Sequence, residues 1–170
     1  MLYASGAAMR PGMFSLHMSA HLLLSLGVSP LLVLAFPTFR PKISGPLAFV
    51  AFNLVTYIVH VPAVFAQLMK PGGMLLESVM FVAAGLLFWW RVAQGGLGAA
   101  LLLLSQMAAC ALLGAAITFS RGAYPMTLPD DTALGGVLMW VLGGFVVMAA
   151  AFYHFIAVLN TQGEQHEQTA

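Results

Sequence analysis

The chain has very little charge. Only 6% of its 170 residues are Asp, Glu, Lys or Arg, whereas about a quarter of the residues of a soluble domain are charged. Hydrophobic residues make up 61% of the sequence, and the mean hydropathy is +0.96. Such a chain cannot cover itself with a hydrated surface, which excludes an ordinary soluble domain and indicates that the lipid bilayer is its solvent.

Cysteine and catalytic motifs are nearly or wholly missing from the sequence. Cys110 stands alone inside an apolar run, so a disulfide within the chain and a CxxC metal or redox motif are excluded. The net charge is +1 and there is no basic patch, so nucleic acid is not an expected partner. There is also no nucleophile elbow, no phosphate-binding glycine loop and no HExxH motif. The sequence therefore predicts no catalytic residues and a protein that is not an enzyme.

Long apolar runs are what the sequence has in abundance. Runs of about 20 apolar residues predict helices that span a bilayer, and the sequence contains five of them: 14–36, 46–69, 74–92, 97–119 and 133–159. The first run is long enough to span, so we expect a retained helix and not a cleaved signal. The sequence predicts an all-α, polytopic membrane bundle that forms one domain over residues 1–160. A polar C-terminal tail follows at 161–170.

Five spans would place the two termini on opposite sides of the membrane. Positive residues divide evenly between the two sides, so their count does not decide the orientation. The tightest pair, Arg40 and Lys42, is assigned to the cytoplasm. This assignment predicts that the N-terminus lies outside and the C-terminus in the cytoplasm.

Ionisable residues of the spans gather in one half of the bilayer. With a rise of about 1.5 Å per residue, His17, His21, His60, Glu77 and Asp131 all fall on the side where the first span begins. Ionisable groups inside a membrane are rare and often functional. His17 and His21 are four residues apart, so they share a helix face and can bind one metal ion. Hydrogen bonding to neighbouring helices is the alternative.

Methionines lie on the same side. Met13 precedes His17 by one turn, and Met18 lies between His17 and His21. Thioether sulfur is a soft ligand that suits Cu(I), and imidazole suits copper too, although a single methionine is often apolar filler. The candidate metal ligands are His17, His21, His60, Met13 and Met18.

Three further features of the sequence lead to predictions about the spans. Glu77 and Asp131 are expected to support the metal site or to cap helices, since each is close to a helix start. Pro62 should kink the second span beside His60 and leave backbone carbonyls in need of partners. The opposite membrane interface is predicted to carry an aromatic belt, which consists of Phe88, Trp89, Trp90, Arg91 and Tyr153.

Four segments, in this order, resemble one membrane family: HMSAHLLL…SPLLVLAFP, YIVHVPAVFAQLM, LLESVMFVAAGLLFWWRV and DTALGGVLMWVLGG. Together they are similar to the CtaG family, the membrane assembly factors of caa-type cytochrome c oxidase, over roughly residues 14 to 159. The resemblance implies a protein of the bacterial inner membrane that delivers copper to a haem–copper oxidase, with oxidase subunits or another membrane complex as partner. It carries over His17, His21, His60 and Asp131 as site residues. The family pattern has histidine where Ser78 stands and glutamine where Thr132 stands.

Three functions remain open from the sequence. The first is a copper-binding assembly factor, similar to a metallochaperone, that holds Cu(I) near the outer face of the membrane. The second is a small accessory or structural subunit of a respiratory or other membrane complex, in which the polar residues only join helices. The third is a membrane b-type cytochrome, in which haem b is ligated by histidines on two facing helices.

Overall fold

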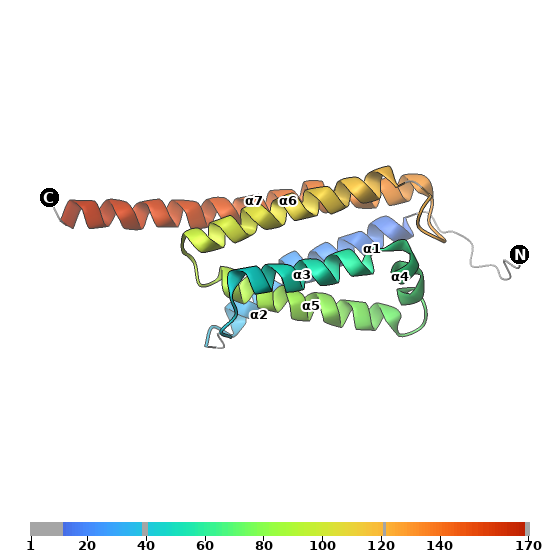
Figure 1. The fold of residues 1–170 in the computed structure, drawn as a ribbon, viewed down its shortest axis with the longest axis horizontal. Coiled ribbons are helices and arrows are strands. Elements are labelled where there is room, and N and C mark those ends of the chain that lie inside the picture. Colours follow the sequence, from blue (N-terminus) through green and yellow to red (C-terminus); the bar gives the residue numbers. More distant parts are fainter. Residues whose placement is uncertain (1–11, 39–40, 121, 169–170) are drawn as a thin grey trace, which may run out of the picture.

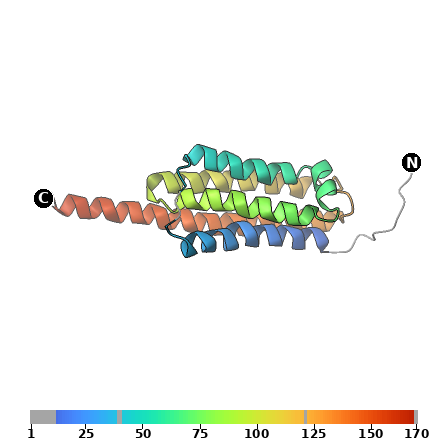
Figure 2. The same cartoon turned by 90° about the horizontal axis from the view of Figure 1, so that it is seen from below.

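The chain folds into a bundle of helices. A computed structural model describes residues 12–38, 41–120 and 122–168, and all regular structure in these ranges is helical, which confirms the predicted all-α class. The elements are α1 (Met13–Leu22), the π-helical segment η1 (Leu23–Val28), α2 (Ser29–Ala35), α3 (Gly45–Val59), α4 (Pro62–Leu68), α5 (Gly73–Val92), α6 (Gly96–Phe119) and α7 (Pro129–Gln168). The long helices lie side by side, and α7 extends beyond the others at its C-terminal end (Figures 1 and 2).

The lengths and compositions of the helices suit a membrane. Four helical segments of the described chain are long and apolar enough to cross a bilayer, and the bent pair α3–α4 raises the number to as many as five. Large apolar side chains point away from the bundle, among them Leu16 at 72% exposure and Phe119 at 84%. Lipid tails are the environment in which such a surface is stable. The chain is a multi-pass membrane protein.

The second predicted span is not one straight helix. α3 ends at Val59, α4 begins at Pro62, and their axes differ by 80°. Val61 is extended, with φ −68° and ψ 125°, because a residue before proline avoids the helical conformation. Pro62 then opens α4, where a missing N–H does no harm. The kink expected at Pro62 is therefore a sharp corner, and α4 lies across one end of the bundle (Figure 1).

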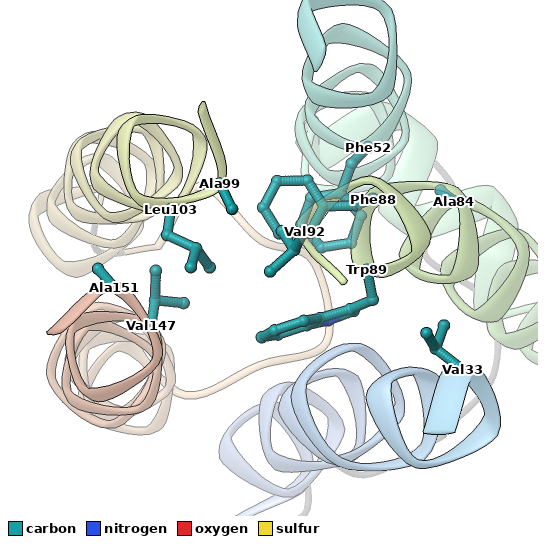
Figure 3. Packing of buried hydrophobic residues seen from close by; sticks show 10 residues of the cluster. All are labelled: Val33, Phe52, Ala84, Phe88, Trp89, Val92, Ala99, Leu103, Val147 and Ala151. Carbon is teal, nitrogen blue, oxygen red and sulfur yellow. The ribbon is translucent and has the colours of Figure 1, made fainter. Parts of the chain in front are cut away.

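The predicted aromatic belt is wrong for two of its members. Phe88 and Trp89 are 1% and 8% exposed and belong to a hydrophobic core to which α2, α3, α5, α6 and α7 all contribute (Figure 3). The indole Nε1 of Trp89 donates a hydrogen bond of 2.7 Å to the backbone oxygen of Ser25, inside η1. A π-helical turn leaves backbone groups out of the α-helical pattern, and this indole satisfies one of them.

Small residues allow the closest helix contacts. Gly85 of α5 faces Ser29 of α2 so closely that an added Cβ would lie 3.0 Å from the Ser29 Cβ. Gly114 of α6 and Gly136 of α7 meet in the same way, backbone against backbone. Membrane helices use small residues at such crossings because lipid provides no hydrophobic force to press the helices together.

Two of the predictions stay open after the fold is known. α7 continues through the polar segment to Gln168, while the division into a domain at 1–160 and a tail at 161–170 stays a prediction. Arg40, one of the pair used to predict the orientation, lies outside the described residues. The orientation in the membrane therefore also stays a prediction.

Candidate metal centre

Two helices bring two histidines and a carboxylate together. His17 and His21 lie one turn apart on α1, and Glu77 faces them from α5. The Nε2 atoms of His17 and His21 are each 3.4 Å from a different carboxylate oxygen of Glu77. One ligand atom from each of the three side chains can be chosen so that all lie within 4.8 Å of one another. We call these three residues the His–Glu centre.

The His–Glu centre is buried and incompletely hydrogen-bonded. The side chains of Glu77, His21 and His17 are 1%, 8% and 9% exposed. Both Glu77 oxygens, His17 Nε2 and His21 Nδ1 are buried without a hydrogen bond from any described residue. Buried polar atoms without partners are costly, and two imidazoles with one carboxylate form a donor set that binds transition-metal cations. The residues present therefore fit a bound metal ion.

Glu77 does not cap its helix. We expected it to support the site or to cap its helix, but α5 begins at Gly73 and Glu77 lies beyond the first turn. Its carboxylate points into the bundle and not at a helix end. The neighbouring Ser78, which stands where the family pattern has histidine, donates its hydroxyl to the Met74 carbonyl of its own helix at 2.8 Å. The residue of α5 that belongs to the His–Glu centre is thus Glu77, directly before Ser78.

Aromatic rings hold the two imidazoles in place. Phe81, one turn after Glu77, stacks on His21 with ring centroids 4.2 Å apart and planes at 26°. Phe65 of α4 meets the His17 ring edge-on at 5.4 Å. Neither phenylalanine was predicted as a site residue. The spacing of four residues between Glu77 and Phe81 places both on one face of α5, and this is the signal that sequence reasoning missed.

His60 and Met18 lie beside the His–Glu centre and not within it. The His60 and His21 rings are 5.5 Å apart, centroid to centroid. His60 Nδ1 is 2.5 Å from the Thr56 backbone oxygen, and His60 Nε2 is 3.2 Å from the Met18 sulfur. Four of the five predicted ligands are therefore near one another. The fifth, Met13, is 52% exposed at the start of α1.

The corner between α3 and α4 leaves a carbonyl that the bundle satisfies from elsewhere. Tyr124, in the segment between α6 and α7, donates its hydroxyl to the His60 backbone oxygen at 2.6 Å. The N–H of Val64, four residues after His60, bonds the Val61 oxygen instead, so Tyr124 supplies the donor that the His60 carbonyl would otherwise lack. It also links the corner beside His60 to the connection between α6 and α7.

Replacing Tyr124 with phenylalanine should lower the free energy of unfolding by about 1 kcal/mol, the usual net value of one hydrogen bond. Burial raises the pKa of Tyr124 from 10.0 to about 12. Because the folded pKa is the higher one, the stability due to the neutral phenol is complete below pH 10 and is lost as the pH rises through 12. Denaturant titrations in detergent at about pH 8 and about pH 11 should therefore show a larger alkaline loss in the wild type than in Tyr124→Phe. Equal alkaline losses would contradict this role of Tyr124.

Asp131 fastens the start of α1. Its carboxylate accepts hydrogen bonds from the backbone N–H groups of Phe14 at 2.8 Å and Ser15 at 3.3 Å, and from the Ser15 hydroxyl at 2.6 Å. The carboxylate of an α7 residue therefore caps a different helix, α1. Asp131 is not in the His–Glu centre. It positions the helix that carries His17 and His21.

A small cavity adjoins His21 and His60. Its volume is about 20 Å³, and its lining includes Met18, Gln106 and Cys110. A space of this size accepts one water molecule or one ion, whereas pockets for larger organic ligands reach roughly 300 Å³ or more. The packing around these histidines thus has no room for a haem macrocycle.

The fold and the His–Glu centre define a class of protein: a multi-pass membrane helical bundle with a buried histidine–carboxylate centre in one half of the bundle. A family model for the cytochrome c oxidase caa3 assembly factor (Caa3_CtaG) matches residues 39–161, which is more than half of the chain. The chain belongs to this family, as its sequence resemblance predicted. Comparison with curated proteins and with solved structures gave no match. The matched segment includes His60, Glu77 and Asp131, while His17 and His21 precede it.

Proposed function

We propose that this chain is a copper-binding assembly factor that carries copper as cargo for a haem–copper cytochrome c oxidase. The observation that carries the proposal is the His–Glu centre, where two imidazoles and a carboxylate converge inside a membrane bundle. Several of their nitrogen and oxygen atoms are buried without a hydrogen bond from the described residues. Neutral imidazole is the commonest metal ligand in proteins, and an anionic carboxylate offsets the charge of a cation in a medium of low dielectric constant. Membership of the assembly-factor family supports this use of the centre.

The His–Glu centre is placed for exchange as well as for binding. His17 is its most exposed member, at 9%, and lies nearest the start of α1. Met13 precedes His17 by one turn and exposes half of its side chain. A thioether at this position offers a soft ligand to an incoming or departing copper ion. Copper would thus exchange through the end of the bundle where α1 begins.

The proposed location and partner follow from the same argument. We place the chain in the bacterial inner membrane with its N-terminus outside and its C-terminus in the cytoplasm. The His–Glu centre then lies in the outer half of the bilayer. The partner is a membrane subunit of the oxidase that takes copper from this side, and no enzymatic step is assigned to the chain itself.

Copper retention by the purified full chain tests the proposal. Wild type in detergent, loaded with copper and washed with a competing chelator, should retain copper, and a His17→Ala/His21→Ala double variant should retain less. His154→Ala is the matched control, because His154 is a histidine of α7 outside the His–Glu centre. Cells that depend on this chain for oxidase assembly should lose oxidase activity with the double variant and keep it with the control.

Other outcomes would point to the alternatives. A wild type that retains no copper but co-purifies with a larger membrane complex would overturn the proposal in favour of the accessory-subunit function. A Soret absorption band in the purified chain would favour haem b, which the 20 Å³ cavity does not accommodate. Equal copper retention by wild type and double variant would remove the His–Glu centre from the proposal.

A further inference from the structure

The contact between Met18 and His60 is unusual in its chemistry. The Met18 sulfur and the His60 Nε2 atom are 3.2 Å apart, and the two residues are 1% and 3% exposed. Met18 comes from α1, and His60 stands at the corner between α3 and α4. Neither residue belongs to the His–Glu centre.

The hydrogen bond on the other side of the His60 ring decides whether the nitrogen that faces Met18 carries a proton. His60 Nδ1 is 2.5 Å from the Thr56 backbone oxygen, and a carbonyl oxygen can only accept, so Nδ1 carries the proton. A neutral imidazole has one N–H and one lone pair, and the lone pair is therefore on Nε2. Thioether sulfur is also an acceptor without a hydrogen to donate. Two electron-pair donors thus lie together in a buried place, an arrangement that calls for a cation beside them that both can bind.

The surroundings suit an ion and exclude a larger ligand. Met18 and His60 both line the 20 Å³ cavity, together with Cys110 and Met139, and this volume is that of a single water molecule or ion. The wall of the cavity is mostly apolar, so a strongly hydrated cation would be poorly solvated there. Thioether and imidazole ligands select soft ions such as Cu(I).

We propose that Met18 and His60 form a second metal position, specific for a soft monovalent cation of the Cu(I) type, beside the harder His–Glu centre. This inference rests on the proposed copper-carrying function and assigns that function two neighbouring positions with different ligand chemistry. The His–Glu centre offers two nitrogens and an oxygen, which also suit divalent ions. The Met18–His60 position offers one sulfur and one nitrogen.

X-ray absorption at the copper edge can detect the proposed sulfur ligand directly. The full chain in detergent is loaded with Cu(I) under anaerobic, reducing conditions, and wild type is compared with Met18→Leu. Leucine matches methionine closely in volume, so the packing should be retained. Met148→Leu is the matched control, since Met148 of α7 is 37% exposed and does not line the cavity beside His60. We expect copper–sulfur scattering in wild type and in Met148→Leu, and its loss in Met18→Leu.

Affinity measurements supply the second readout. Replacing a residue that only hydrogen-bonds a metal ligand typically weakens metal binding by roughly 10- to 100-fold. Met18→Leu removes a ligand itself, so it should weaken Cu(I) binding by more than this. Zn(II) binding at the His–Glu centre should stay unchanged. Copper bound without sulfur scattering in wild type, or sulfur scattering that persists in Met18→Leu, would overturn the second position while leaving the proposed function intact. A wild type that binds no copper would overturn the proposed function itself.

Discussion

Replacing Glu77 with glutamine should weaken copper binding at the His–Glu centre by about a thousandfold. The substitution keeps the size of the side chain but removes its negative charge, which lies 3.4 Å from two imidazole nitrogens that would share the ion. A unit charge about 4 Å from another contributes about 4 kcal/mol at an effective dielectric constant of about 20, and each 1.4 kcal/mol is a factor of about ten in Kd. Competition with a chelator of known affinity, using the metal alone as the ligand, measures this change.

The stability of the metal-free chain separates this effect from misfolding. Glutamine keeps the shape of the side chain and is less costly to bury than an ionised carboxylate, so the metal-free chain should be as stable as before, or more stable. Asp130→Asn is the matched control, because it removes one negative charge from an exposed position at the start of α7. A thousandfold loss in both variants would show that overall charge, and not the Glu77 carboxylate, governs binding. An unchanged Kd in Glu77→Gln would remove Glu77 from the centre.

Replacing Gly136 with alanine should destabilise the bundle by about 3 kcal/mol, the upper part of the usual range for overpacking. An added Cβ at Gly136 would lie 2.7 Å from the Gly114 backbone oxygen and 2.7 Å from the Thr118 backbone nitrogen. Both atoms belong to the backbone of α6, so a side-chain rotation cannot relieve the contact. α6 and α7 would have to move apart along the most extensive helix contact of the described chain. Denaturant titration in detergent micelles measures the change in the free energy of unfolding.

Gly144 provides a control on the same helix. An added Cβ there meets nothing within 4 Å, and alanine is the better helix former by about 1 kcal/mol. Gly144→Ala should therefore be neutral or stabilising. If the Gly136 and Gly144 variants were equally stable, close packing of α6 on α7 would not be what holds these two helices together.

Much of the fold follows from the order of apolar and turn residues. Runs long enough to span the bilayer predicted the helices, and Pro62 predicted a kink beside His60. The spacing of His17 and His21 placed both imidazoles on one helix face, which needs only the helical repeat. Each of these inferences depends on residues close together in the sequence, where local geometry is sufficient.

The residue that faces these histidines from another helix could not be predicted from local sequence in the same way. Glu77 reaches His17 and His21 only because α5 is rotated so that its carboxylate faces α1. That rotation depends on contacts such as Gly85 against Ser29, which belong to distant segments. In a soluble helix a polar face would reveal the rotation, but lipid and protein interior are both apolar, so the two faces of α5 carry similar residues.

The same ambiguity explains the error at the aromatic residues. Phe88 and Trp89 have the composition of an interfacial belt, and either side of α5 could have carried them to lipid. The tertiary structure turns them inward, where the Trp89 indole finds the carbonyl that η1 leaves free. Asp131 likewise caps a helix that starts near Phe14, 117 residues earlier in the sequence. No local sequence signal predicts this contact.

The sequence by itself therefore determined the solvent of this protein, its helices, the kink at Pro62 and the end of the spans near which its ionisable residues gather. Hydropathy and helical repeat are properties of neighbouring residues, and they are sufficient for these conclusions. Only the tertiary structure decided that Glu77 completes the His–Glu centre, that His60 faces the Met18 sulfur, and that Asp131 fastens α1. These contacts depend on how each helix is rotated and packed, and in a bilayer that rotation is set by close contacts between distant segments.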